Sequence, residues 1–355
     1  MAKELKNTLP YQLIRGDKRV DYRRLLLATI QSRFFKTKPI VAWLLCGNIN
    51  TGSSRIHGIN ISRELNRQGI ASHILQQPQS YEEEFTLNYY VIKKILASSI
   101  DVVMFQRVHK NATGFVHDLR ATGKKSIFVM ADYFPTEMPH VCDQVIVISD
   151  VLKDLLVQDG ISANKVTVIP DAVETDHTQC KNHSDHANQK IKVVWVGNEG
   201  HWETINVIKE ALNDPKLSHF ELVTISAHKE AMIPWRLDTI WNDILACDIA
   251  VIPADITKDE SQAKSNNRLT MFKALGIPVI CSPLSTYRKI INHGVNGFFA
   301  ESLQGWQECL YFLKDRDTRQ RIGLKDRDRI LHQYGLPTIA GMYKDIITKV
   351  LHAKR

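Results

Sequence analysis

The chain has 355 residues, which is more than one ordinary hydrophobic core and suits two domains. Its composition is 44% hydrophobic and 24% charged, which excludes disorder as the default state. No stretch approaches the roughly 18 apolar residues of a membrane-spanning helix, and the N-terminus lacks the apolar region of a secretory signal. The six cysteines have no C-x-x-C spacing and are expected to be reduced, so we expect a cytoplasmic protein.

The net charge of +8 is concentrated at the N-terminus, because residues 1–38 contain ten Lys or Arg and only three acidic side chains. Such a basic extension can bind an anionic membrane surface, and we take a peripheral location on the inner face of the membrane as one hypothesis. A solvated extension without a partner explains the same charge. No nucleic-acid partner is expected, because no basic face with interleaved aromatic residues and no zinc motif accompanies it.

In chain order, apolar runs typical of buried strands alternate with amphipathic stretches typical of helices. The first half is predicted to contain strands at 39–47, 71–77, 101–107, 125–132, 143–149 and 165–171, and helices at 53–69, 89–99, 114–123 and 152–160. After a polar stretch without periodicity at 174–190, the predicted strands are 192–197, 220–226, 249–254, 277–283 and 296–302. The predicted helices of this half are 204–214, 237–248, 267–276, 285–294, 305–315, 318–333 and 338–352.

Continuous apolar strands separated by helices predict parallel sheets that are covered on both faces. We therefore predict an α/β protein with two doubly wound, Rossmann-like domains. Ligands of such sheets bind beyond the carboxyl ends of the strands, so an interdomain cleft is the expected site. The predicted organisation is a basic extension (1–38), a first domain (39–173), a linker (174–190), a second domain (191–335) and a C-terminal helix (336–355) that is a candidate to cross back to the first domain.

The turn after the first strand of the first domain contains Gly47 and Gly52 and leads into a helix. A helix N-terminus favours anions, but the glycine pattern of a dinucleotide site and the lysine of a P-loop are both missing. A structural turn capped by a serine explains the same residues. The candidates for acceptor binding here are Gly52, Ser53, Arg55 and His57.

Polar residues also follow the third and fourth predicted strands of the first domain. Arg107 and His109 come after the third strand, and Asp132 comes after the fourth. Such groups can contact a bound sugar or accept a proton from a hydroxyl, although a structural histidine and an Asx-turn are the alternatives. The candidate catalytic residues are His109, Asp132 and Arg107.

The second domain offers two segments for binding an anion. Backbone amides in the turn after its first strand can cradle a phosphate. The segment that begins at Lys264 leads into a helix with Asn266 as its expected N-cap, and the helix end with Lys264 and Arg268 forms a strong anion site. A leaving nucleoside diphosphate needs such neutralisation, whereas a solvated basic helix start is the alternative. The donor-binding candidates are Gly197, Asn198, Glu199, Lys264, Ser265, Asn266, Asn267 and Arg268.

The polar stretch contains His177, Cys180, His183 and His186, which are residue types that bind metals. Their spacing is irregular and no partner cluster accompanies them, so no metal site is expected.

Several segments together resemble a known family. KVVWVGN (192–198), ILACDIAVIPA (244–254) and the region 264–313 resemble the donor-binding domain of retaining GT-B glycosyltransferases of family 4, and 143–174 resembles the end of their N-terminal domain. The resemblance runs from about residue 40 to the C-terminus and is sharpest over 241–313. It implies a donor diphosphate against 264–271 and the 197–200 turn, an acceptor on the first domain, and front-face transfer with retention, without a metal or a separate cofactor.

The chain departs from this family at one motif. Members carry two glutamates eight positions apart, and this chain has Ala263 and Met271 at those places. The resemblance then implies that a contact to the nucleotide ribose or to a sugar hydroxyl is missing, or is supplied by Glu260 or another group.

The predicted activity is that of a hexosyltransferase-like glycosyltransferase. It would use a nucleotide-sugar donor and a glycan or lipid-linked acceptor, in the biosynthesis of a surface polysaccharide. The alternatives are a GT-B-like sugar-nucleotide epimerase and a catalytically inactive GT-B partner protein, which the missing glutamates favour. A NAD-dependent dehydrogenase is disfavoured by the absent glycine fingerprint.

Overall fold

The computed structural model describes residues 39–82, 86–175, 178–184 and 189–353. The predicted basic extension therefore lies outside the described residues. The chain forms two compact units: unit 1 takes the chain up to Ile148, then Leu152–Ile169 and the residues from Ile339, and unit 2 takes Ser149–Val151 and Pro170–Thr338. Among the described residues, no helix combines the length and apolar character needed to cross a bilayer.

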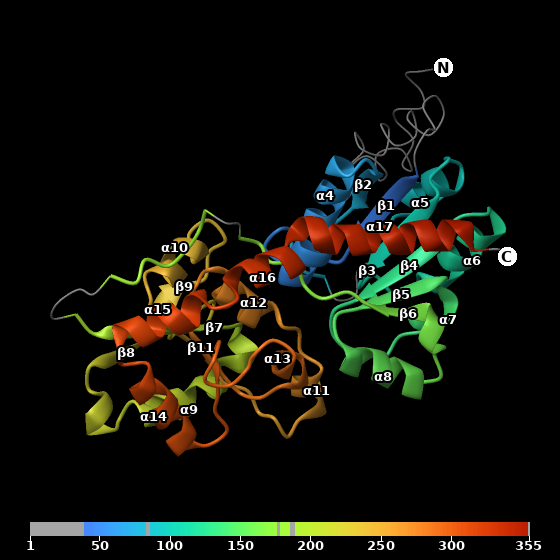
Figure 1. Cartoon of the computed structure of the whole chain (residues 1–355). Coiled ribbons are helices and arrows are strands. Elements are labelled where there is room, and N and C mark those ends of the chain that lie inside the picture. The colour runs from blue at the N-terminus through green and yellow to red at the C-terminus, as the bar shows by residue number, and fades with distance from the viewer. Residues whose placement is uncertain (1–38, 83–85, 176–177, 185–188, 354–355) are drawn as a thin grey trace. The chain divides into compact units, whose positions relative to one another are not determined.

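Unit 1 is built on a parallel six-stranded sheet (Figure 1). Its strands are β1 (Ile40–Leu45), β2 (Ala71–Gln76), β3 (Val102–Gln106), β4 (Lys125–Met130), β5 (Gln144–Val147) and β6 (Val166–Val168). Its connections contain α3 (Gly52–Ser54), the π-helix η2 (Arg55–Asn60), α4 (Ile61–Arg67), α5 (Tyr89–Leu96), α6 (Thr113–Ala121), α7 (Met138–Val141), α8 (Asp150–Gln158) and the 3₁₀-helix η3 (Ala163–Lys165). The strands are buried apolar runs, as a sheet covered on both faces requires.

The strand order of unit 1 is β2-β1-β3-β4-β5-β6. The chain therefore leaves β1 toward one edge of the sheet and returns to pair β3 on the other side of β1. This reversal is a topological switch point, where the loops after the two neighbouring strands diverge and leave a crevice. In unit 1 this switch point lies beyond the carboxyl ends of β1 and β3.

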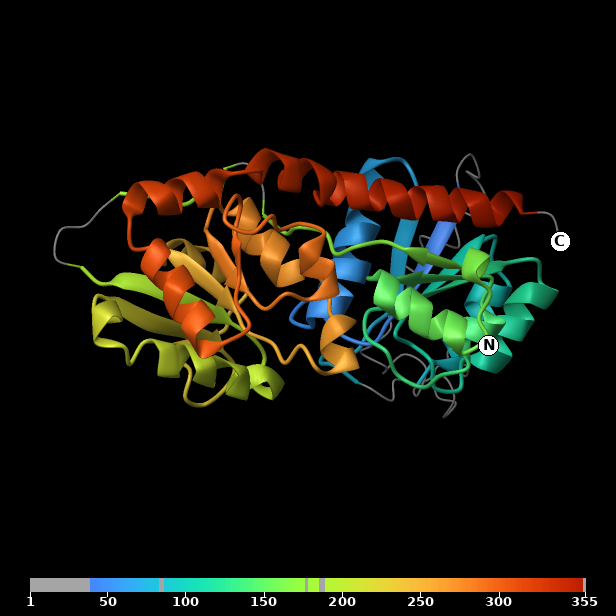
Figure 2. The same ribbon diagram turned by 60° about the horizontal axis from the view of Figure 1, so that its bottom comes forward.

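The last helix, α17 (Leu336–His352), begins in unit 2 and continues into unit 1. Its unit 1 portion lies beside α4, as Figure 1 and Figure 2 show. Tyr343 packs against Trp43 of β1 with the ring centroids 6.1 Å apart, and the Lys344 amine donates to the Gln68 carbonyl at 3.4 Å. The end of the chain is thus part of the cover of the first sheet.

Unit 2 repeats the design with a second parallel six-stranded sheet, in the order β12-β11-β10-β7-β8-β9. Its strands are β7 (Ile191–Val196), β8 (Phe220–Ser226), β9 (Ile233–Pro234), β10 (Ile249–Ile252), β11 (Val279–Cys281) and β12 (Phe298–Phe299). The chain runs outward from β7 through β8 and β9 and then returns to pair β10 with the other side of β7. The switch point of unit 2 therefore lies beyond the carboxyl ends of β7 and β10.

Two apolar clusters cover the faces of the second sheet. One joins residues of α10 (Ile240–Leu245), α12 (Asn267–Ala274), α13 (Ser285–Arg288) and α16 (Arg327–Gln333). The other joins η4 (Glu199–Ile205), α9 (Asn206–Ala211), η5 (Pro215–Leu217), α14 (Leu303–Phe312) and α15 (Arg316–Leu324). The short helix α11 (Asp259–Gln262) lies in the connection between β10 and α12.

The described part of the polar stretch 174–190 packs on unit 2. The Lys181 amide donates to the Leu275 carbonyl at 2.7 Å, and its amine lies 3.0 Å from the Asp248 carboxylate. A ring nitrogen of His183 lies 2.9 Å from the Gly276 carbonyl oxygen. These contacts give the segment defined partners on α12 and β10.

Candidate functional site

The turn that follows β7 is held close to the core of unit 2. A Cβ atom at Gly197 would lie 2.3 Å from the buried Trp195 ring, so only glycine fits there without a shift of the tryptophan. Asn198 and Glu199 come next and are exposed, with Glu199 opening η4. The turn therefore brings its backbone close to the sheet at the switch point, with polar side chains turned to solvent.

Arg268, on the first turn of α12, reaches this turn. Its guanidinium donates to the Val196 carbonyl oxygen at the end of β7, with a nitrogen–oxygen distance of 3.3 Å. The guanidinium also lies near the Tyr287 hydroxyl: burial raises the pKa of that hydroxyl, and the positive charge of Arg268 opposes the rise. The structure thus brings together the two segments of unit 2 that were predicted to bind the donor.

The N-terminus of α12 differs in one detail from the prediction. Asn266 is the N-cap residue, as expected, but its side chain accepts no hydrogen bond from the helix amides. Its Oδ1 is buried without a hydrogen-bond partner among the described residues. A buried amide oxygen with no donor is uncommon, so this atom is available to a ligand or a water molecule.

The cations next to α12 have no acidic partner in the described part of the chain. Lys264 and Arg268 form no ion pair with any carboxylate there, and both are partly exposed. Ser265 accepts a hydrogen bond from the Asn267 amide at 3.3 Å, which shapes the loop before the helix. Two uncompensated cations at a helix N-terminus create a local positive potential that suits a di-anion.

The positions of the missing glutamates are apolar and buried. Ala263 is 6% exposed, and Met271 is 8% exposed within the core that joins α12 to the sheet. The side chain of Glu260 lies outside the part of the chain that is described. Neither Ala263 nor Met271 can hydrogen-bond a ribose or sugar hydroxyl, so a donor would have to be held mainly through other groups.

In unit 1, the three predicted catalytic residues lie at the carboxyl edge of the sheet, where Arg107 has several partners. Its guanidinium pairs with the Asp132 carboxylate and donates to the Tyr81 hydroxyl at 3.2 Å. It also stacks over the Phe134 ring, 5.1 Å from the centroid, and the His109 ring lies 4.9 Å from that same ring. Arg107, Asp132 and His109 thus belong to one cluster through Phe134.

The backbone at Arg107 adopts a left-handed conformation, with φ of 57°. A non-glycine residue in this region costs of order 1 kcal/mol or more and is enriched at functional sites. The amide of Arg107 donates to the Val129 carbonyl of β4 at 3.1 Å, so the turn is held by the neighbouring strand. This conformation fixes the direction in which the guanidinium leaves β3.

The predicted acceptor residues on the first helix do not all reach the surface. Gly52 and Ser53 are partly exposed, and a Cβ at Gly52 would meet nothing within 4 Å. Arg55 and His57 are 8% and 2% exposed, and His57 Nδ1 lies 3.3 Å from the Tyr343 hydroxyl of α17. These two side chains are therefore packed inside unit 1, and the acceptor-binding role of Gly52, Ser53, Arg55 and His57 stays a prediction.

Sequence reasoning missed a buried polar network that ties this helix to β3. The Ser54 hydroxyl donates to Gln106 Oε1 at 2.8 Å, and the Cys46 thiol contacts the same oxygen at 3.5 Å. Burial raises the pKa of the Cys46 thiol, which keeps it neutral. These contacts fix the first turn of the helix next to Arg107. The only sign of this network in the sequence is Gln106, a polar residue in the otherwise apolar run 102–106.

The histidine-rich stretch shows no metal centre in the part that is described. His177 and His186 lie outside the described residues, Cys180 is exposed, and burial lowers the pKa of His183. No group of three or more potential ligand side chains occurs among the described residues.

No protein-family model matches this chain, and no curated relative does. Solved structures are similar over most of the chain. HepE from Anabaena, crystallised with UDP and glucose, is 14% identical with a TM-score of 0.64, over 88% of this chain and 99% of HepE. A glycosyltransferase from Rickettsia africae is 16% identical with a TM-score of 0.62, over 90% of this chain and 100% of its own.

Sucrose-phosphate synthase from Thermosynechococcus elongatus is 12% identical with a TM-score of 0.62, over 89% of this chain and 100% of its own length. Identities this low show the fold and leave the activity open. The parallel six-stranded sheets in both units and the similarity to these enzymes confirm the predicted fold class: the chain has the GT-B architecture of two Rossmann-like units.

Proposed function

We propose that the chain is a glycosyltransferase that takes a sugar from a nucleotide-sugar donor bound to unit 2. The observation that carries this proposal is the position of Arg268, whose guanidinium lies at the carboxyl end of β7 on the first turn of α12. A nucleoside diphosphate carries its charge on the phosphates, and this corner offers a guanidinium, the Lys264 amine and the amides that open α12. The UDP complexes known for HepE are compatible with a ligand of this class.

The chemistry that this site supports is stabilisation of a leaving group. When a glycosidic bond to a nucleoside diphosphate breaks, negative charge grows on the β-phosphate. Cations that have no carboxylate of their own are available to neutralise that charge without first breaking an ion pair. No separate cofactor or metal is part of the proposal, because a nucleotide sugar carries its own leaving group.

We assign the acceptor to the cluster of unit 1. Asp132 is a carboxylate that can hold or deprotonate a hydroxyl, and Tyr81 and Phe134 offer flat surfaces beside it. His109, at the edge of the same cluster, is a second group that can exchange a proton. Such a site suits a neutral, hydroxyl-rich acceptor, and a glycan or a lipid-linked sugar of a surface polysaccharide has this chemistry.

The test is a panel of UDP-, GDP-, dTDP-, ADP- and CMP-sugars. A bound donor raises the melting temperature by mass action, so we expect the preferred nucleotide sugar to give the largest increase in melting temperature. The best donor is then incubated with candidate glycan acceptors, and both sugar transfer and release of the nucleoside diphosphate are measured. A donor that is converted to an epimer without transfer would favour the epimerase alternative.

The variant for this test is the double substitution Lys264→Gln with Arg268→Gln. Its matched control is Lys314→Gln with Arg321→Gln, which removes the same charge from exposed positions on unit 2. The proposal expects the site variant to lose the donor-induced shift and the transfer, while the control keeps both. If no nucleotide sugar shifts the melting temperature of the unmodified protein, the enzyme proposal fails and an inactive partner protein is favoured.

Retention of the anomeric configuration is the finer form of this proposal. Among the described side chains, the proposed donor site contains no pair of carboxylates of the kind that a double-displacement mechanism needs. Front-face attack assisted by the donor phosphate requires no such pair. The configuration of the product, read by NMR from the anomeric coupling constant, decides this point.

A further inference from the structure

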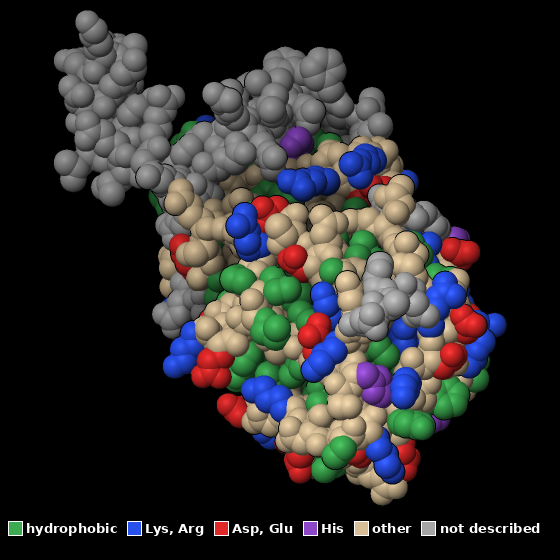
Figure 3. All heavy atoms as spheres, turned by 90° about the vertical axis from the view of Figure 1, so that its left-hand side faces the viewer, with side chains coloured by type: hydrophobic (Ala, Val, Ile, Leu, Met, Phe, Trp, Pro, Cys, Tyr) green, Lys and Arg blue, Asp and Glu red, His purple; other side chains and the backbone are tan. Residues whose placement is uncertain are grey.

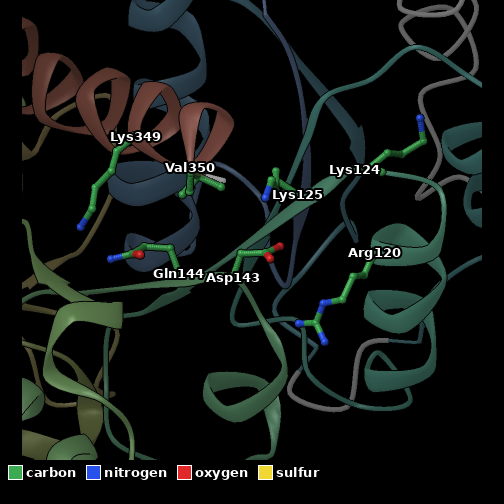
Figure 4. Close-up of a pocket in the computed structure, with 9 residues that line it drawn as sticks. Arg120, Lys124, Lys125, Asp143, Gln144, Lys349 and Val350 are labelled. Atoms are coloured by element: carbon green, nitrogen blue, oxygen red, sulfur yellow. The ribbon is translucent and has the colours of Figure 1, made fainter. Parts of the chain in front are cut away.

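A surface cavity of about 450 Å³ lies in unit 1, at the edge of the sheet opposite the Arg107 cluster. Its lining comes from the amino ends of β4 and β5, from the C-terminal ends of α6 and α17, and from the turn after α6 (Figure 4). We call it the amino-edge pocket. It is lined by Arg120, Gly123, Lys124, Lys125, Asp143, Gln144, Lys349, Val350 and Ala353.

Cations from three separate elements line the amino-edge pocket. Figure 4 shows Lys349 descending from α17 toward Gln144, Lys125 near Asp143, and Arg120 on the α6 side. None of these three cations forms an ion pair with a carboxylate in the described part of the chain. On the face drawn in Figure 3, by contrast, basic and acidic side chains are interspersed. The pocket is therefore a local concentration of positive charge.

The single acidic side chain of the pocket is already engaged. Asp143 Oδ2 accepts hydrogen bonds from the amide and the hydroxyl of Ser126, each at 2.8 Å. Lys124 turns away from the cavity in Figure 4, and its amine donates to the Ile100 carbonyl at 3.1 Å. Three cations and one hydrogen-bonded carboxylate leave an excess of positive charge around a space that is large enough for a small ligand.

The C-terminal ends of two helices stabilise two of these cations. Arg120 and Lys349 lie in the last turns of α6 and α17, where a cation interacts favourably with the negative end of the helix dipole. Lys125 is the first residue of β4, so no helix end stabilises its charge. Its amine forms no hydrogen bond within the described part of the chain. Three cations line the pocket with one carboxylate, so repulsion between the like charges is only partly offset, and an anionic ligand reduces it.

We propose that the amino-edge pocket is a second anion site, which binds a phosphate-bearing ligand through Arg120, Lys125 and Lys349. This site is separate from the donor site on unit 2, and the proposal holds whether or not the chain transfers sugars. Its ligand bridges α17 to β4, and therefore fastens the end of α17 to the first sheet. The phosphate is carried by a soluble molecule or by a lipid headgroup.

The experiment compares the full chain with Lys125→Gln/Lys349→Gln and with the control Lys93→Gln/Lys94→Gln. The control removes the same charge from exposed positions on α5 of the same unit. Pyrophosphate is titrated at low ionic strength, also in the Arg268→Gln background so that binding at the donor site does not contribute. In a second arm, each protein is sedimented with phosphatidylcholine vesicles, with and without phosphatidylglycerol. Melting temperatures without any anion verify that the variants are folded.

For a soluble ligand, the pocket variant binds pyrophosphate about tenfold or more weakly than the control does, because charge-assisted hydrogen bonds are lost. For a lipid headgroup, the pocket variant loses binding to phosphatidylglycerol vesicles while the control retains it. The proposal is overturned if the pocket variant matches the control in both arms. If Arg268→Gln loses donor binding while the pocket variant matches the control in both arms, the proposed activity stands and this site alone is rejected.

Discussion

The cations at the carboxyl edges of the two sheets differ in whether an acidic side chain compensates their charge. In unit 1, Arg107 is paired with Asp132 and stacked on aromatic rings, so its charge is already compensated. In unit 2, Lys264 and Arg268 have no carboxylate partner among the described residues, and the Arg268 guanidinium donates to the Val196 carbonyl. One fold thus presents a neutralised edge and a positive edge at equivalent switch points.

Under the proposed function, this difference suggests that the donor binds to unit 2 and the acceptor to unit 1. A compensated cluster with a carboxylate and aromatic rings suits a neutral polyol, which needs hydrogen bonds and flat surfaces. Cations without an acidic partner suit a diphosphate, because no existing ion pair has to be broken before the phosphates bind. The substitutions below test this assignment from the largest expected effect to the smallest.

The largest expected effect is the dependence of stability on pH that Lys273, the second cation of α12, produces. Lys273 is buried, unlike Arg268, and its amine donates to the carbonyls of Asn296 and Lys325 at 2.6 and 3.3 Å. Burial lowers the pKa of Lys273 from 10.5 to about 8. Folding therefore favours the neutral amine, and the full cost of burying the charge applies below pH 8. Between pH 8 and 10.5 the unfolded chain binds more protons, so stability rises with pH, by about 3 kcal/mol in total.

The substitution Lys273→Met removes this rise. Five of the six tryptophans lie in unit 2, so tryptophan fluorescence during urea unfolding reports mainly on that unit. The difference in unfolding free energy between variant and unmodified chain should shrink or reverse as the pH increases from 7.5 to 10. Parallel pH profiles for the two proteins would show that Lys273 does not bury a charge.

The second effect contrasts Arg268→Gln with Arg107→Gln. Hydrogen bonds to charged groups contribute about 1.5–3 kcal/mol, so Arg268→Gln should weaken nucleoside diphosphate binding by about 10- to 100-fold. Arg107→Gln should change that affinity by less than about twofold and lower the transfer rate instead. Calorimetry with the nucleoside diphosphate and initial rates with saturating donor separate the two. Equal losses of affinity would abolish the distinction between the two edges.

The third effect compares the glycines in the first turn of each unit. In Gly197→Ala the new Cβ lies 2.3 Å from the buried Trp195 ring, and overpacking of this kind costs about 2 kcal/mol. In Gly47→Ala the new Cβ lies 2.4 Å from Thr51 Oγ1 and 2.6 Å from Thr51 Cβ, but Thr51 is partly exposed and its turn can shift more easily than the buried Trp195 ring. Urea unfolding followed by circular dichroism should show a clear loss for Gly197→Ala and a smaller one for Gly47→Ala. The reverse order would mean that the turn of unit 2 is not held against its sheet.

The smallest effect is the stability change of Asp132→Asn. The Asp132 side chain is 48% exposed, and exposed ion pairs contribute less than about 1 kcal/mol. The melting temperature should therefore barely change, whereas the transfer rate should fall if the carboxylate holds the acceptor as proposed. A large loss of stability with unchanged rate would make Asp132 a structural residue of unit 1.

Much of the fold could be predicted because buried parallel strands are continuous apolar runs. The strand predicted at 220–226 and the buried run before Gly197 match β8 and β7. The single helix predicted over 318–333 is wrong, because α15 and α16 are separated at Asp326, which has a φ of 64°. Its carboxylate accepts a hydrogen bond from the Asn296 side chain at 2.8 Å, a distant contact that local periodicity does not encode.

The candidate sites were predicted in part, for a related reason. Residues that follow strands meet at one edge of a parallel sheet, so the association of Gly197 with Arg268 could be expected. The partners of Arg107 could not, because Tyr81 and Phe134 lie in segments without periodicity. His57 was placed by α-helical spacing, but this segment is the π-helix η2, whose wider turn changes the direction of each side chain. Strand order, which creates the switch points, is a tertiary property.

The most direct test of the central claim is a crystal structure with the nucleoside diphosphate of the best donor bound. The account predicts that the diphosphate contacts the Arg268 guanidinium and the amides that open α12, beside the Gly197 turn. A diphosphate bound at another place, with the Arg268 guanidinium still donating to the Val196 carbonyl, would contradict it.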